Sequence, residues 1–519
     1  MSVVAINPIM PGFYPDPSIC MVGEDFYLVH STFAYFPGLP VFHSKDLAHW
    51  DQIGNAMDRI DQLPLKKAGH SQGLFAPTIR YHNGTFYIIC TNVSYGGNFV
   101  ITAEKPEGPW SDPYYLEGAD GIDPSLFFDE DGTCYYIGTH ENPEGCRYNG
   151  DYYIWIQELD LENMKLVGEK CNVWNGAMRQ IVWPEGPHLY KKDGYYYIVH
   201  AEGGTGPEHA VTVCRSKNIM GPYQNNFCNP ILTHRHLGQD YPIKYVGHAD
   251  LVQTKCGEWY MVMLAVRPRS GYTTMGRETF LAKVTWENGW PVVNPGYGRL
   301  TDTVEIDLPE WNIGEAGKKV EKVYDFTSMD QLGHEFLMLR NPSEKMYLLE
   351  KNEGLKLLCN SVTLKEKGSP SYICVRQQHH DFKASTTLDT APLIEGKRAG
   401  IVYMQSNEYH LRVEASKEIA TMMMCTNGED QILGSVDISD NSSIKVSLII
   451  NGLYAKVEIE NSKKEKLYTS KPIDIRALST EVAGGFVGCT VGMYAVSESN
   501  TNATEERACF TEFTYIERE

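Results

Sequence analysis

The sequence predicts an all-β protein in which a five-bladed β-propeller is followed by a β-sandwich. Three observations lead to this prediction. An aromatic strand motif recurs five times in the N-terminal part, alternating apolar and polar residues characterise the C-terminal part, and neither part shows strong helical periodicity. At roughly 150 residues per domain, the 519 residues allow two or three domains.

The repeated motif is a turn followed by a short strand rich in aromatic residues. Its five copies occupy residues 24–27, 83–87, 131–136, 193–197 and 256–260. The tyrosines that close the copies are separated by 60, 49, 61 and 63 residues. This period is somewhat longer than the roughly 40–50 residues of common propeller repeats and leaves room for long loops. Five unrelated hairpins in a sandwich are the alternative interpretation.

A second feature of the repeat predicts ionisable residues at the propeller axis. Eleven to thirteen residues before each closing tyrosine lies a segment that we expect to form the innermost strand of a blade. These segments begin with Asp16, Ala76, Asp123, Glu185 and His248. Because equivalent positions face the central axis, the sequence predicts that the three carboxylates and the histidine converge.

A change in composition marks the domain boundary. All nine tryptophans lie at or before Trp311, and only four of the 27 prolines follow it. We therefore expect a propeller domain over residues 1–311, a polar linker over 312–323 and a sandwich over 324–519. In the sandwich, an Asn451-Gly452 turn between alternating strands predicts a β-hairpin. The sandwich contains no evident catalytic motif.

Charge and cysteine usage exclude several classes of function. The formal net charge of -20 would repel nucleic acid and anionic membranes, and the sequence contains no apolar stretch of membrane-spanning length. The N-terminus has no export signal. The 13 cysteines contain no Cys-x-x-Cys pair, which favours reduced thiols and a cytoplasmic location.

Three carboxylates around one cavity have pKa values that are driven apart, because like charges resist joint ionisation. Glycoside hydrolysis needs such a split. One carboxyl must stay protonated to donate to the leaving oxygen, while another must stay ionised to activate water or attack the anomeric carbon. The alternative for Asp16 and Asp123 is that each Asp-Pro-Ser segment only begins a strand with an Asx-type turn.

The motifs in combination resemble those of glycoside hydrolase family 43, whose members are five-bladed propellers that act on arabinose- and xylose-containing polymers. The motifs are Gly12-Phe13-Tyr14-Pro15-Asp16-Pro17-Ser18, Ser31-Thr32-Phe33, His43-Ser44-Lys45-Asp46-Leu47, Phe75-Ala76-Pro77, Asp123-Pro124-Ser125-Leu126-Phe127, Glu185-Gly186-Pro187-His188-Leu189-Tyr190, Gly247-His248-Ala249 and Gly276-Arg277-Glu278-Thr279. The resemblance implies that Asp16 is the general base, Glu185 the general acid and Asp123 the carboxylate that positions Glu185 and tunes its pKa. It also implies hydrolysis with inversion of configuration.

The resemblance assigns further residues to the sugar site. Phe33 and Phe75 are expected to form apolar walls, Thr205 to lie at the rim and Arg277 to donate hydrogen bonds to sugar hydroxyls. Phe486, in a glycine-rich loop of the sandwich, is expected to approach the site. For the three aromatic residues, core packing is the alternative. His248 is expected beneath the pocket, either bound to one calcium ion or hydrogen-bonded without metal.

The resemblance thus implies an exo-acting, inverting glycosidase without an organic cofactor. It would release terminal α-L-arabinofuranosyl or β-D-xylosyl residues from arabino- and xylo-oligosaccharides derived from hemicellulose. The Gly12-Phe13-Tyr14-Pro15 opening and Phe75 place arabinofuranosidase first, with β-xylosidase as a second activity. A non-catalytic carbohydrate-binding propeller is the alternative. The retaining fructan hydrolases are disfavoured because their Arg-Asp-Pro and Glu-Cys segments are absent from the sequence.

Overall fold

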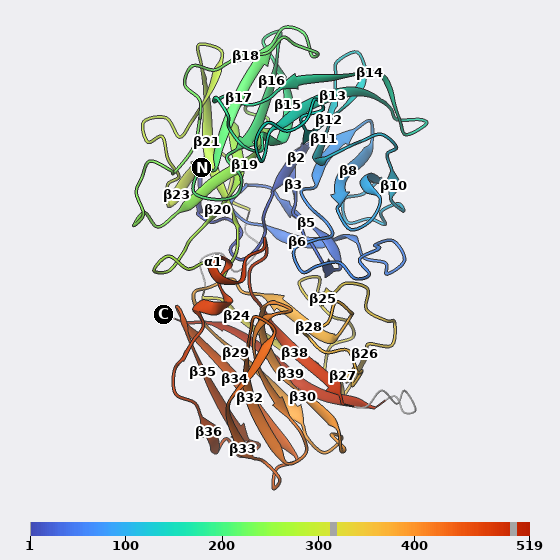
Figure 1. The fold of residues 1–519 in the computed structure, drawn as a ribbon, viewed down its shortest axis with the longest axis vertical. Helices are drawn as coiled ribbons and strands as arrows, with labels where there is room; N and C mark the ends of the chain where they lie inside the picture. The colour runs from blue at the N-terminus through green and yellow to red at the C-terminus, as the bar shows by residue number, and fades with distance from the viewer. Residues whose placement is uncertain (1, 312–318, 499–505, 519) are drawn as a thin grey trace.

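The protein consists of two all-β bodies that lie end to end along its long axis (Figure 1). The structure, a computed structural model, describes residues 2–311, 319–498 and 506–518. Residues 312–318, most of the predicted linker, lie outside the described residues. The first strand after them, β24 (Glu321–Asp325), begins inside the linker range that the composition predicted.

Five four-stranded antiparallel sheets form the propeller and confirm the predicted number of blades. The first is β2 (Ser18–Val22), β3 (Asp25–Val29), β5 (Gly38–Ser44) and β6 (Asp51–Met57). The second is β7 (Thr78–His82), β8 (Thr85–Asn92), β9 (Gly97–Ala103) and β10 (Tyr114–Tyr115). The third is β11 (Ile122–Phe128), β12 (Cys134–Glu141), β13 (Tyr152–Asp160) and β14 (Lys165–Trp174). The fourth is β15 (Glu185–Lys192), β16 (Tyr195–Glu202), β17 (Ala210–Ser216) and β18 (Gln224–Asn225). The fifth is β19 (Lys244–Gln253), β20 (Trp259–Val266), β21 (Glu278–Glu287) and β22 (Trp290–Val293).

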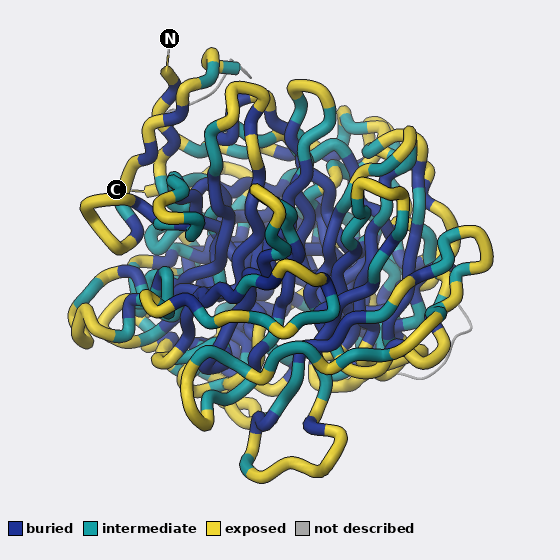
Figure 2. Tube along the Cα trace, turned by 90° about the horizontal axis from the view of Figure 1, so that it is seen from above, coloured by how far each residue is buried: buried dark blue, intermediate teal, exposed yellow. Residues whose placement is uncertain are grey.

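The repeated motif is the hairpin between the first and second strands of a blade. In the second and fourth blades the turns are Asn83-Gly84 and Asp193-Gly194, with all four residues at positive φ. Two-residue hairpins with a type I′ turn need this left-handed backbone at both turn positions, and Asn, Asp and Gly adopt it at low cost. The aromatic residues that follow then pack between neighbouring blades, and the buried strands occupy the centre of the molecule (Figure 2).

Outside the blades, strand β1 (Val3–Ile6) pairs with β23 (Thr303–Ile306). This two-stranded ribbon joins the two ends of the propeller segment and packs through Val3, Ala5, Val304 and Ile306 on the core between the first and fifth blades.

The second body is a sandwich of one nine-stranded and one six-stranded sheet. The larger sheet contains β24, β26 (Tyr347–Glu350), β27 (Gly354–Leu358), β29 (Asp381–Asp389), β34 (Ser443–Asn451), β35 (Tyr454–Asn461), β36 (Lys466–Thr469), β37 (Ile473–Asp474) and β39 (Arg507–Glu517). The smaller sheet contains β28 (Ser371–Arg376), β30 (Lys397–Ser406), β31 (Tyr409–Ala415), β32 (Ile419–Thr426), β33 (Glu429–Asp437) and β38 (Thr490–Ser497). The predicted Asn451-Gly452 turn connects β34 to β35, with Asn451 opposite Tyr454.

Helical structure is confined to a short 3-10 turn, Arg476–Leu478, and to helix α1 (Thr480–Ala483) in the described residues. No helix in this part of the chain is long and apolar enough to span a membrane. All 13 cysteines are free thiols.

The two bodies share a hydrogen-bonded and apolar interface. Strand β4 (Tyr35–Phe36) of the propeller pairs with β25 (Met338–Leu339) of the sandwich segment. Next to this ladder, the buried Arg340 donates its Nε–H to the carbonyl of Ala68 at 2.7 Å. Since buried polar groups are costly unless they are paired, these bonds fix the orientation of the sandwich on the propeller.

Candidate active site

The predicted axial residues Asp16, Asp123 and His248 lie on or just before the innermost strands and have a strained backbone conformation. Asp16, Asp123 and His248 have φ values of 53°, 52° and 50°, in the left-handed region. In the fourth blade this conformation belongs to Gly186, with φ 56°, and not to Glu185. Glu185 therefore lies one residue before the equivalent axial position, which corrects the expectation that all four residues are equivalent.

The absence of a side chain at Gly186 has a steric cause. A Cβ atom there would lie 2.8 Å from the imidazole Cε1 of His248, closer than van der Waals contact allows. The His248 ring thus fills the axial space of the fourth blade, and the carboxylate of this blade comes from the preceding residue.

Asp16 is held as a carboxylate by three neighbours. The Ser31 hydroxyl donates to its Oδ2 at 2.6 Å, and Arg277 Nη1 donates to its Oδ1 at 2.7 Å. His248 Nδ1 lies 4.0 Å from the same Oδ1. Burial raises the pKa of Asp16, but Arg277, His248 and Ser31 together outweigh it and keep the pKa below its usual value.

Glu185 has the opposite electrostatic surroundings. Burial, followed by the charges of Asp123 and Asp16, raises the pKa of Glu185 well above its usual value, and Arg277 opposes this only in part. No group in the described part of the chain hydrogen-bonds to the Glu185 carboxyl. The protonated form of this side chain is therefore free to donate to a ligand.

Asp123 connects the two other carboxylates. The backbone N–H of Gly186 donates to Asp123 Oδ2 at 3.2 Å, which ties Asp123 to the neighbour of Glu185. Burial and the charge of Asp16 raise the pKa of Asp123 to about 6, against the opposing effect of His248. The pKa values of the carboxylates are divided as predicted: the pKa of Asp16 is lowered, which favours its ionised form, whereas the pKa of Glu185 is raised, which favours its protonated form.

The raised pKa of Asp123 has a consequence for stability. Between its ordinary pKa of 3.8 and about 6, the unfolded chain has lost the Asp123 proton while the folded chain keeps it, so rising pH favours unfolding. Asp123→Asn should therefore raise the free energy of unfolding by up to about 3 kcal/mol at pH 8, following about 1.4 kcal/mol per pKa unit. At pH 4 most of the gain should be lost, because the unfolded chain then also binds much of the proton. Denaturant unfolding of both proteins at the two pH values measures it, and a gain that is equal at both would contradict the assignment.

Three phenylalanines cluster on the apolar side of the site, and two of them contact Arg277. The ring centroid of Phe33 lies 5.7 Å from that of Phe75 and 6.2 Å from that of Phe486. The Arg277 guanidinium lies 5.7 Å from the ring centroid of Phe33 and 5.6 Å from that of Phe486. Phe33 is only 1% exposed and also belongs to the core between the two bodies, whereas Phe486 is 39% exposed. Core packing in the sandwich, the alternative considered for Phe486, therefore does not apply.

The sandwich reaches the site through residues 480–489, which we call the strap. The Glu481 carboxylate accepts hydrogen bonds from the backbone N–H of Thr273 at 2.6 Å and from its hydroxyl at 2.8 Å. The backbone N–H of Phe486 donates to Ser71 Oγ at 2.9 Å, and its carbonyl accepts from Arg277 Nη2 at 3.4 Å. The strap thus completes the wall of a site whose carboxylates belong to the propeller, and α1 lies at this junction (Figure 1).

A second polar layer lies along the axis, two residues further along the innermost strands. Arg80 donates to both carboxylate oxygens of Asp250, at 2.8 and 3.2 Å, and to His188 Nδ1 at 2.9 Å. Asp250 also accepts from Ser18 Oγ at 2.7 Å and from the Tyr190 hydroxyl. Burial raises the pKa of Asp250, but Arg80 and His188 bring it below its usual value. The motifs did not predict this layer, although the position of Asp250, two residues after His248, matches those of Ser18 and Ser125 in the repeat.

This layer bears on the calcium ion expected at His248. Calcium prefers six to eight oxygen ligands, but among the described residues the carboxylate oxygen paired with His248 is Asp16 Oδ1, at 4.0 Å and already bound by Arg277. The next layer contributes a guanidinium cation. Water would have to supply the other ligands of a calcium ion held by His248, and calcium stays a prediction.

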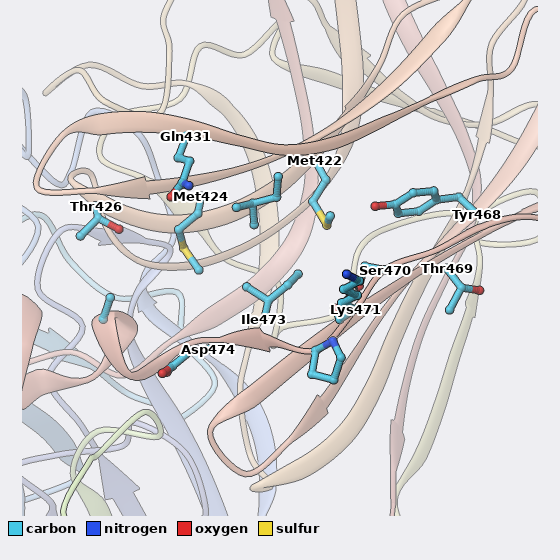
Figure 3. Close-up of a pocket in the computed structure, with 13 residues that line it drawn as sticks. Met422, Met424, Thr426, Gln431, Tyr468, Thr469, Ser470, Lys471, Ile473 and Asp474 are labelled. Carbon is cyan, nitrogen blue, oxygen red and sulfur yellow. Dashed lines mark hydrogen bonds between the residues drawn. The ribbon is translucent and has the colours of Figure 1, made fainter.

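A large cavity lies away from these carboxylates, in the sandwich. It has a volume of about 710 Å³ and is lined only by sandwich residues, among them Met422, Met424 and Tyr468 (Figure 3). Its one carboxylate, Asp474, is paired with Arg476. A single paired carboxylate cannot divide into an acid and a base, so this cavity is not the catalytic site.

A five-bladed propeller with one ionised and one protonated carboxyl at the same end of its axis defines a carboxylate-dependent glycoside hydrolase. The profile of glycosyl hydrolases family 43 matches residues 5–291, and that of the beta xylosidase C-terminal concanavalin A-like domain matches residues 323–516. The chain belongs to glycosyl hydrolases family 43.

Relatives match over nearly the whole chain. A protein of Butyrivibrio fibrisolvens named "Xylosidase/arabinosidase" is 52% identical, covering 96% of this chain and 97% of the relative. The "Non-reducing end alpha-L-arabinofuranosidase BoGH43B" of Bacteroides ovatus is 38% identical, covering 96% and 93%. The crystal structure of a xylan beta-1,4-xylosidase from Bacillus halodurans C-125 superposes with a TM-score of 0.90 at 33% identity, covering 99% of this chain and 100% of that structure.

Proposed function

We propose that this enzyme is an exo-acting, inverting glycosidase that releases terminal α-L-arabinofuranosyl and β-D-xylosyl residues from short hemicellulose fragments. The observation that carries the proposal is the division of protonation states between Asp16 and Glu185. The names of the relatives from Butyrivibrio fibrisolvens and Bacteroides ovatus support the two sugar classes. A non-catalytic binding protein would not need this division, and the family membership does not favour it.

The proposed reaction is a single displacement with two proton transfers, one from Glu185 to the glycosidic oxygen and one from the attacking water to Asp16. The protonated carboxyl of Glu185 donates its proton to the glycosidic oxygen as the bond to the anomeric carbon breaks. The ionised carboxylate of Asp16 accepts a proton from the water that attacks this carbon from the opposite face. The products are the free sugar, with inverted configuration at its anomeric carbon, and the shortened oligosaccharide, whose new hydroxyl carries the proton from Glu185.

The other residues prepare these two groups. Arg277 and Ser31 hold Asp16 ionised and fix its orientation through hydrogen bonds to both carboxylate oxygens. Asp123 raises the pKa of Glu185, so that the acid is protonated at the pH at which the base is ionised. Phe75 and Phe486 offer an apolar surface to the CH groups of the sugar, and the buried Phe33 packs against both rings.

The first test combines rates with stereochemistry. We expect the enzyme to hydrolyse both p-nitrophenyl α-L-arabinofuranoside and p-nitrophenyl β-D-xylopyranoside. Proton NMR of the first product formed should show the β-anomer of arabinose and the α-anomer of xylose, before mutarotation mixes the anomers. Retention of configuration would contradict the assignment of Asp16 as a base, and binding of both glycosides without turnover would contradict hydrolysis itself.

A further inference from the structure

A pocket of about 510 Å³ lies beside the segment that leads into Glu185. Its lining comes from the loop between β12 and β13 and from the segment after β14. Arg147, Tyr148, Met178 and Arg179 are among the lining residues. The volume falls within the roughly 300–1,000 Å³ of pockets that hold small ligands. No group named in the proposed reaction lines this pocket.

Hydrogen bonds join the two walls of the pocket close to the catalytic acid. The Tyr148 hydroxyl donates to the carbonyl of Ile181 at 3.0 Å. The backbone N–H of Trp183 donates to the carbonyl of Gly150 at 2.8 Å. Trp183 precedes Glu185 by two residues, so the same segment forms one wall of the pocket and carries the acid.

The beginning of this segment is anchored beside the strand partner of Glu185. The Glu202 carboxylate accepts a hydrogen bond from the backbone N–H of Ala177. Glu202 follows Ala201, which lies opposite Glu185 in the ladder between β15 and β16. Because Glu185 donates its proton to the departing oxygen, the leaving part of the oligosaccharide lies on this side of the site. The pocket is thus placed to contact the part of the substrate that leaves.

The pocket carries positive charge in a protein whose formal net charge is -20. Two arginines line it, and none of its lining residues is Asp or Glu. A third arginine, Arg235, donates from Nη2 to Sδ of Met178 at 3.2 Å. Arg147 is paired with Asp151, whereas Arg179 and Arg235 have no carboxylate partner in the part of the chain that the structure describes.

The pairing with Asp151 fixes the direction of Arg147. The buried Asp151 carboxylate accepts from Arg147 Nε at 2.8 Å and from Nη2 at 2.7 Å. Nη1 has no acceptor among the described residues, so it stays available to a ligand. A guanidinium that is already oriented loses little freedom when it forms another hydrogen bond. The pocket therefore combines one oriented donor with the two uncompensated charges of Arg179 and Arg235.

We propose that this pocket binds the carboxylate of a uronic acid substituent on the leaving part of the oligosaccharide, an inference that rests on the proposed function. Arginine matches a carboxylate with parallel N–H donors, and such charge-assisted bonds are stronger than those to neutral hydroxyls. The overall negative field of the protein repels anions, so an acidic substrate needs a local cluster of this kind. Tyr148 and Met178 contact the CH groups of the same sugar ring.

Two pairs of matched substrates test the inference. In the first pair, xylotetraose carries a 4-O-methyl-α-D-glucuronosyl group at O2 of the second unit from the non-reducing end, either intact or with its carboxyl reduced to CH₂OH. The second pair carries the same groups on the third unit. Because the members of a pair differ only at this carbon, the ratio of their kcat/KM values for release of terminal xylose reports on the carboxylate. We expect the acidic member to be favoured by about 3–10-fold in at least one pair.

Substitutions and salt identify the groups responsible. Arg179→Gln should reduce this ratio by about 3-fold, mainly through a higher KM for the acidic member, and Arg235→Gln should change it in the same direction. The matched control is Arg518→Gln, which removes the same charge from an exposed position in the sandwich and should leave the ratio unchanged. Raising the salt concentration from about 0.01 M to about 1 M shortens the Debye length from about 30 to about 3 Å. It should therefore bring the wild-type ratio toward unity.

Equal kcat/KM values for the acidic and neutral members of both pairs would overturn the inference. Equal losses on both members in Arg179→Gln would also overturn it, because they are expected if the arginines bind neutral hydroxyls. Neither result would affect the proposed function, which release of xylose from unsubstituted xylotetraose tests separately. A wild-type enzyme that releases no xylose from any of these oligosaccharides would refute the proposed function itself.

Discussion

Replacing Glu185 by Gln should reduce kcat/KM for xylobiose by about 10³–10⁴-fold, because the amide cannot protonate the departing oxygen. The loss should depend on the leaving group. A 2,4-dinitrophenolate departs without a proton, so the same variant should retain nearly wild-type activity on 2,4-dinitrophenyl β-D-xylopyranoside. Steady-state rates on xylobiose, the p-nitrophenyl and the 2,4-dinitrophenyl glycosides measure this dependence.

The leaving-group series separates loss of acid catalysis from damage to the site. A misfolded or distorted site would lose activity on all three substrates in the same proportion. Equal losses for Glu185→Gln, together with an unchanged midpoint of thermal unfolding, would therefore show that Glu185 is not the proton donor.

Asp16→Asn should lose about 10²–10⁴-fold in kcat on every one of these substrates, because water must be activated whichever group leaves. The variant should also be less stable. In the folded protein the ionised Asp16 pairs with Arg277 and accepts from Ser31, and its substitution leaves the Arg277 guanidinium without its carboxylate. Thermal unfolding at pH 7 should show a lower midpoint than in the wild type.

The contrast with Asp123→Asn makes this second prediction specific. Both substitutions remove one buried carboxylate from the same site, yet the pKa of Asp16 is lowered and that of Asp123 is raised. Folding therefore favours the charge of Asp16 and opposes that of Asp123, and the two midpoints should move in opposite directions at neutral pH. Shifts in the same direction would show that the two carboxylates do not have these different environments.

The sequence predicted the architecture because the propeller is built from local units. Each blade begins with a hairpin whose turn residues and aromatic strand are visible within a few positions, and the repeat multiplies this signal five times. The same repeat brought Asp16 and Asp123 to the axis. The repeat predicted the position of Glu185 wrongly by one residue. The axial position of the fourth blade is Gly186, because the His248 ring of another blade leaves no room for a side chain there.

What the sequence could not predict depends on contacts between distant residues. Arg80 meets Asp250 across 170 positions, and Thr273 meets Glu481 across 208. No local pattern encodes such partners. The approach of Phe486 to the site followed only from family resemblance, since its own surroundings, a glycine-rich loop, would equally suit the core of a sandwich.

The order in which the chain is synthesised gives the strap a further significance. Domains generally fold N-terminal first as they emerge from the ribosome, so the propeller and its carboxylates precede Glu481 and Phe486. A nascent propeller would present Asp16 and Glu185 in a cleft that lacks one wall. The site would be complete only after the sandwich has docked, because the strap supplies Glu481 and Phe486 to its wall.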